Sequence, residues 1–140
     1  MPFSTYYSVQ SADDAARLAS GGEPWPTSPN KAHIGAGLYS WGTRDDAQLY
    51  WERLRNRGID VDILSFRISN SNLKKLRRLD LRPPISDTIV NGWLEIHSSL
   101  YGEGRPHSYQ YVIRMTNSGA EHYFSKDVFP LFTLILNAER

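Results

Sequence analysis

The spacing of apolar residues changes several times along the chain, and each spacing predicts a kind of element. Between residues 44 and 57 the apolar side chains recur with the period of an amphipathic helix. The residues that keep this period are Ala47, Tyr50, Trp51 and Leu54. Thr43 stands before them as a helix cap and Gly58 after them as a stop, so we predict a helix between these two positions.

Further helices are predicted from serine residues at helix starts. Ser11 precedes a short alanine-rich run that carries acidic residues in its first turn. Ser71 precedes the run Asn-Leu-Lys-Lys-Leu-Arg-Arg, and Ser86 precedes a longer run with the helical period. The periodic residues of that longer run are Ile89, Val90, Trp93, Leu94, His97 and Leu100.

Runs rich in β-branched and aromatic residues predict the strands. They cover residues 5–10, 59–68, 79–81, 109–115, 121–124 and 131–137, with 34–40 as a short strand or an extended turn. We expect 59–68 to be a central strand, and an Asn-Ser-Gly turn to join 109–115 to 121–124. Elements alternate early and strands dominate late, which favours a single α+β domain over residues 1–140 with a mostly antiparallel sheet.

Composition narrows the classes of function. The 140 residues carry a formal net charge of +1, which gives no argument for a nucleic-acid or membrane partner. The absence of cysteine excludes disulfides, thiolate zinc sites and a cysteine nucleophile. No apolar run reaches the roughly 20 residues that span a bilayer, and the N-terminus lacks a signal-peptide pattern. We therefore expect a cytoplasmic protein, or an effector exported without a signal peptide, and no membrane partner.

The short motifs of this sequence give little evidence of a catalytic or binding function by themselves. The four histidines show no ligand spacing, so we predict no metal site. The Gly35-Ala36-Gly37 run matches neither a dinucleotide fingerprint nor a P-loop, and alone it fits a tight turn entering a short strand. No Gly-x-Ser-x-Gly elbow occurs. Basic residues gather in 74–82, either as a solvated face or as an anion or nucleic-acid patch.

Three segments together resemble the ADP-ribosyltransferase superfamily, in the His-Tyr-Glu branch of diphtheria-toxin-like and poly-ADP-ribose-polymerase-like enzymes. The segment GAGLYSWGTRDDAQLYW is similar to the family pattern Gly-x-Gly-Leu/Ile-Tyr, a polar gap, and a helix with an Ala-x-x-Tyr-like face. VDILSFRISNSNLKKLRRLDL resembles a strand, a short Leu-Lys-Lys-Leu segment and a second strand. GAEHYFSKDVFPLF resembles the closing strand that begins with Glu or Gln. Within the branch, the chain looks most like small bacterial domains.

This resemblance implies split, mostly antiparallel sheets with peripheral helices and a cleft that binds NAD as substrate. It implies that Tyr39 stacks on the nicotinamide ring, that Tyr50 completes the aromatic wall, and that Gly35 and Gly37 let the backbone approach the cofactor. Glu121 would be the catalytic carboxylate. It would hydrogen-bond the nicotinamide ribose and stabilise the positive charge that develops as the glycosidic bond breaks.

The chain departs from the family in the first strand, where the family has a histidine and this sequence has Ser8. We expect Ser8 and its neighbour Tyr7 to contact the cofactor, and an alternative alignment gives the role to Tyr7 or Gln10. His122 follows Glu121 directly, so in one strand the two side chains would lie on opposite faces and would not act as a pair.

Two functions follow from these expectations. The first is an NAD-dependent ADP-ribosyltransferase, of the toxin or effector kind, that modifies an unidentified protein or nucleic acid. The second is a catalytically inactive module on the same fold that binds a protein partner, an inhibitor or an ADP-ribose-like ligand. Acceptor choice is expected to lie in the loops 22–31 and 101–108, because binding residues concentrate on loops.

Overall fold

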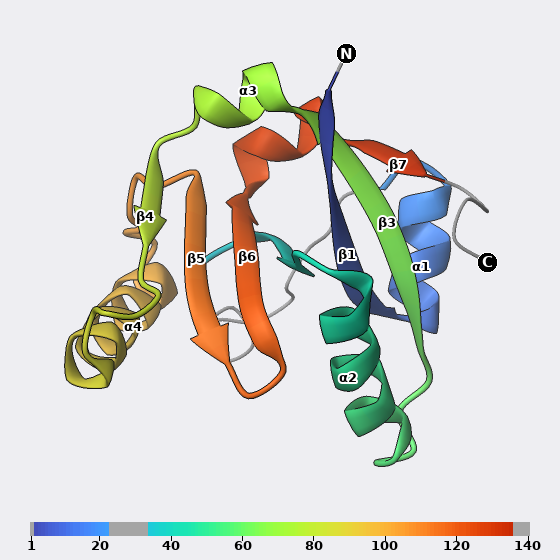
Figure 1. Cartoon of the computed structure of the whole chain (residues 1–140), viewed down its shortest axis with the longest axis horizontal. Coiled ribbons are helices and arrows are strands. Elements are labelled where there is room, and N and C mark those ends of the chain that lie inside the picture. Colours follow the sequence, from blue (N-terminus) through green and yellow to red (C-terminus); the bar gives the residue numbers. More distant parts are fainter. Residues whose placement is uncertain (1, 23–33, 136–140) are drawn as a thin grey trace.

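The computed structural model describes residues 2–22 and 34–135 (Figure 1). Its strands are β1 (Phe3–Ser11), β2 (Gly37–Trp41), β3 (Val61–Ser69), β4 (Arg78–Asp80), β5 (Tyr111–Thr116), β6 (Gly119–Ser125) and β7 (Thr133–Ile135). Its helices are α1 (Ala12–Ala19), α2 (Arg44–Arg55), α3 (Asn70–Lys74), α4 (Asp87–Gly102) and the 3-10 helix η1 (Lys126–Leu131). None of these described helices combines the length and the hydrophobicity that crossing a bilayer requires.

The helix starts follow the predicted caps in three of four cases. The side chains of Ser11, Thr43 and Ser86 each accept a hydrogen bond from a backbone N–H in the first turn. The short helix α3 begins two residues before the predicted position, because Ser69 and not Ser71 accepts the N–H of Asn72. Ser69 is also the last residue of β3, so this strand passes directly into the helix.

The strands form one sheet in the order β4-β5-β6-β2-β1-β3-β7, in which only β4 and β5 run parallel. The mixed, mostly antiparallel architecture is therefore as predicted, but the split into separate sheets is not. The halves β4-β5-β6-β2 and β1-β3-β7 are joined in the described residues at one paired position, Tyr7 with Trp41. The predicted central strand, β3, lies second from an edge because the three residues of β7 cover its outer side.

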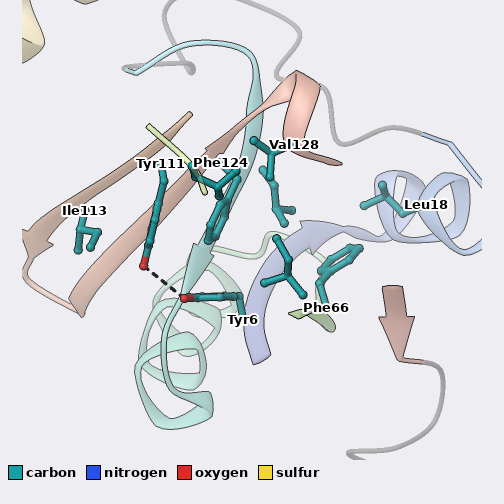
Figure 2. Packing of buried hydrophobic residues seen from close by; sticks show 10 residues of the cluster. Tyr6, Leu18, Phe66, Tyr111, Ile113, Phe124 and Val128 are labelled. Carbon is teal, nitrogen blue, oxygen red and sulfur yellow. Dashed lines mark hydrogen bonds between the residues drawn. The ribbon is translucent and has the colours of Figure 1, made fainter. Parts of the chain in front are cut away.

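One face of the sheet carries the larger hydrophobic core. Tyr6 of β1 packs edge-on against Phe124 of β6, with ring centroids 4.8 Å apart, and Tyr111 stacks on Phe124 at 4.5 Å. Figure 2 shows these rings together with Phe66 and Leu18, and the hydrogen bond of 3.3 Å between the hydroxyls of Tyr6 and Tyr111. These contacts join both halves of the sheet through side chains as well as through backbone pairing.

The opposite face is covered by two helices over different strands. Helix α2 packs on β1 and β3, where the indole nitrogen of Trp51 donates to the carbonyl of Val61 at 2.9 Å. Trp93 of helix α4 packs with Val112 of β5 and Tyr123 of β6. Tyr123 of β6 thus lies beneath α4, whereas β2 also contacts α2.

Candidate functional site

The strand register places Tyr7, Trp41 and Glu121 in one row on the α2 and α4 face of the sheet. Tyr7 is paired with Trp41, and Trp41 is paired with Glu121. Directly paired residues point their side chains to the same face, and so does Tyr39, two residues before Trp41. Tyr50 of α2 packs on Trp41 with ring centroids 5.4 Å apart. The structure thus gathers Tyr7, Tyr39, Tyr50 and Glu121, which the sequence had singled out.

Ser8 lies on the other face of β1 and is fully buried. Its hydroxyl donates to the carbonyl oxygen of Tyr39 at 2.7 Å and accepts from the side-chain amide of Gln10 at 2.6 Å. Ser8 therefore links β1 to β2, and its hydroxyl already makes one donated and one accepted hydrogen bond within the protein. Of the three candidates in the first strand, only Tyr7 shares the face of Glu121.

The hydroxyl of Tyr39 holds the glycine turn that precedes β2. It accepts the N–H groups of Ile34 and Gly35, each at 3.0 Å, and donates to the carbonyl of Gly35 at 2.7 Å. Burial is the main reason why the pKa of Tyr39 is raised, so the hydroxyl stays protonated and keeps this donated hydrogen bond. The hydroxyl is therefore engaged by the turn, and the ring packs against that of Tyr123 with centroids 5.1 Å apart.

Two more side chains hold the same turn. Tyr123 donates from its hydroxyl to the carbonyl of Ala36 at 2.9 Å. The backbone N–H of Tyr109 donates to Nδ1 of His107, so the ring proton lies on Nε2, which donates to the carbonyl of Ile34 at 2.6 Å. Burial lowers the pKa of His107 and favours this neutral form.

Backbone conformation at Gly35 and close packing at Gly37 each favour glycine. Gly35 has a φ of +136°, and a Cβ there would lie 3.0 Å from the hydroxyl oxygen of Tyr123. A Cβ on Gly37 would come within 2.0 Å of the carbonyl oxygen of Phe124. The predicted close approach of backbone is thus an approach to β6, and the tight-turn interpretation explains both residues.

Glu121 forms an ion pair with Arg114, the residue opposite it in the hairpin of β5 and β6. Nε of Arg114 donates to Oε1 of Glu121 at 2.7 Å, and the two side chains are 21% and 13% exposed, respectively. Burial mainly raises the pKa values of Tyr39 and Tyr50, and the negative charge of Glu121 raises both further. The negative charge of Glu121 therefore acts on the phenol groups of both tyrosines.

His122 lies on the opposite face from Glu121, as the alternation of a strand predicted. Its Nδ1 is hydrogen-bonded to the hydroxyl of Tyr111 at 2.6 Å. Burial, assisted by the positive charge of Arg82, lowers the pKa of His122 to about 4. His122 belongs to the core side of the sheet and takes no part in the group around Glu121.

Several residues of this region were not predicted from the sequence. Arg114 could have been found by counting outward from the Asn-Ser-Gly turn, because the hairpin register pairs it with Glu121. Tyr123 could have been placed by the same alternation, two residues beyond Glu121. The contact of His107 with the glycine turn spans 73 positions and has no local signal. Trp41, the partner of Glu121 in β2, is buried.

Other candidate sites add little. Among the described residues no cluster of histidine and carboxylate side chains could hold a metal ion, and His33 lies outside them. The basic residues of 74–82 have exposed side chains, in agreement with a solvated surface. Of the two loops expected to select an acceptor, 22–31 lies almost wholly outside the described residues, whereas 101–108 is described and contains His107.

Comparison with known proteins assigns no family to the chain. No protein-family model matches the sequence. No curated protein matches it significantly.

Proposed function

We propose that this chain is an NAD-dependent ADP-ribosyltransferase. The observation that carries the proposal is the grouping of Glu121 with the aromatic side chains of Tyr39 and Tyr50 on one face of the sheet. Cleavage of the bond between nicotinamide and ribose creates positive charge on the ribose, which a fixed carboxylate stabilises. Aromatic rings suit the planar, cationic nicotinamide.

Within this proposal each residue has a defined role. Glu121 is the catalytic carboxylate, whereas Tyr39 and Tyr50 act through their rings. Tyr7 replaces Ser8 as the cofactor contact of the first strand, because Tyr7 is on the face of Glu121. An ADP-ribosyltransferase-like fold is supported by the single paired position between the two halves of the sheet, which is close to the split that the family resemblance implies.

The acceptor of the ADP-ribose group is a protein or a nucleic acid in this proposal, and the resemblance supports a bacterial toxin or effector. The test is release of nicotinamide from NAD by the wild type and by Glu121→Gln, with and without cell lysate as a source of acceptors. Glu95→Gln, an exposed glutamate of α4, is the matched control. We expect release from the wild type and the control and loss of it in Glu121→Gln. Equal release from all three proteins would contradict the proposed role of Glu121.

A binding module on the same fold is the second candidate, and the committed hydroxyl of Ser8 favours it. A buried serine that links two strands cannot replace the histidine of the family. The module would bind ADP-ribose, a protein partner or an inhibitor without turnover of NAD. Calorimetry with ADP-ribose distinguishes the two candidates: binding that weakens in Tyr50→Ala, together with no nicotinamide release by the wild type, supports the module.

A further inference from the structure

In the part of the chain that the structure describes, the guanidinium of Arg114 has one edge on Glu121 and one edge without a hydrogen-bond partner. Nε donates to Oε1 of Glu121, and neither Nη nitrogen has a hydrogen bond within the described residues. Neither Nη nitrogen belongs to the atoms that are buried without a partner there. Oε2 of Glu121 likewise has no hydrogen bond within the described residues and is not completely buried. Neither free edge of the pair is therefore completely buried.

The surroundings make this pair more than a surface contact. Both side chains are mostly buried, and they stand directly opposite each other close to the turn of a hairpin, so their backbones are held in register. Removing one partner of a buried pair leaves the other charge without compensation. Glu121 is paired with Trp41, two residues after Tyr39 in β2, so the pair lies on the sheet face of the proposed aromatic wall.

We propose that Arg114 is the positioning residue of this site. Its Nε holds one oxygen of Glu121 and leaves Oε2 for the ribose hydroxyl of the substrate, while its positive charge makes the site neutral toward an anionic dinucleotide. This inference rests on the proposed function, because it assigns Arg114 a part in that reaction. The diphosphate of NAD is negatively charged, so an uncompensated carboxylate would repel the substrate that it has to act on.

Two substitutions separate the geometric role from the electrostatic role. Arg114→Ala removes both, so kcat falls and KM for NAD rises severalfold. Added salt brings this raised KM down again, because salt screens the repulsion. Arg114→Lys keeps the charge on a flexible stem and lacks a donor at the position of Nε. We therefore expect the lysine variant to keep the wild-type KM and to lose kcat, by up to about 10²-fold for a misplaced group.

The control is Arg55→Ala, which removes an exposed ion pair with Asp60 at the end of α2. It should leave kcat and KM unchanged. Thermal unfolding of every variant shows whether lost activity reflects lost fold, and if Arg114→Ala does not fold, Arg114→Lys decides by its kcat.

The outcomes distinguish the two proposals. An active wild type with wild-type kcat in both Arg114 variants overturns the role of Arg114 and leaves the proposed function standing. A KM that rises equally in the lysine and alanine variants overturns the electrostatic part. A folded wild type that neither binds NAD nor releases nicotinamide overturns the proposed function, and the role of Arg114 with it.

Discussion

Tyr39 hydrogen-bonds the backbone of Gly35, four residues before it, both as an acceptor from the N–H and as a donor to the carbonyl. The hydroxyl thus organises the turn, whereas the ring has the binding role in the proposed function. The structural role of the hydroxyl and the proposed binding role of the ring can be separated by removing the hydroxyl alone.

Tyr39→Phe should lower stability more than activity. The substitution leaves the N–H groups of Ile34 and Gly35 without their acceptor, and an unsatisfied buried polar group costs about 1–3 kcal/mol. We expect a loss of that size in the free energy of unfolding, measured by urea denaturation, with nicotinamide release retained because the ring remains. Tyr101→Phe is the control, since the Tyr101 hydroxyl has no hydrogen bond among the described residues. Equal stability of both variants would refute the role of the Tyr39 hydroxyl.

Gly37→Ala and Gly92→Ala should change stability in opposite directions. The new Cβ at position 37 would lie 2.0 Å from a backbone carbonyl oxygen of β6, which cannot move without disturbing the strand pairing. At position 92, in α4, the new Cβ would meet nothing within 4 Å, and alanine is favoured over glycine in helices by up to about 1 kcal/mol. Thermal unfolding should show a strong loss for the first variant and a small gain for the second. A tolerated Gly37→Ala would instead mean that β6 can retreat.

Tyr7→Phe and Ser8→Ala separate binding from folding in the first strand. Tyr7 faces the row of Glu121, so loss of its hydroxyl should weaken NAD binding in calorimetry with little change in stability. The hydroxyl of Ser8 in β1 donates to the carbonyl of Tyr39 in β2. Ser8→Ala should therefore lower the free energy of unfolding by about 1 kcal/mol and leave NAD binding unchanged. The reverse result would restore Ser8 as the cofactor contact.

Acidification should destabilise the protein through His122. Its pKa in the folded state is about 4, below the 6.5 of an ordinary histidine, mainly because of burial. Between these pH values the unfolded chain binds a proton on His122 that the folded chain does not. The contribution of His122 to the free energy of unfolding is therefore fully present above pH 6.5 and is lost as the pH drops toward 4. We expect a loss of roughly 2 kcal/mol between pH 7.5 and 5. His107 adds to it in the same direction because its pKa is also lowered.

Urea denaturation at both pH values measures this loss. His122→Gln cannot titrate and should show a smaller pH dependence than the wild type. A variant with the same pH dependence as the wild type would show that other groups govern acid stability.

Local features of this fold were predictable and long-range ones were not. Ser11, Thr43 and Ser86 cap helices because the hydrogen bond they make closes within one turn, which the sequence displays directly. Ser69 was missed in favour of Ser71 because a serine can end a strand and begin a helix at once, and only the paired strand shows where β3 stops.

The candidate site was predictable to the same extent. Glu121 and Tyr39 were found from a motif, and their shared face follows from alternation once the register is known. Arg114 needed the hairpin register, and His107 needed a contact with Ile34 that spans 73 positions. The role of Gly37 depends on the distance to a backbone carbonyl on another strand, which no sequence pattern contains.

The junction between β1 and β2 has a consequence for how the molecule opens. Strands β1 and β3 pair along their whole length, whereas β1 and β2 share one position, so amide hydrogens on either side of this junction should exchange as two separate groups. Tyr7 belongs to one group and Glu121 to the other. A ligand that touches both residues would tie the two groups together, so slower exchange across the junction would report its binding even where no chemistry follows.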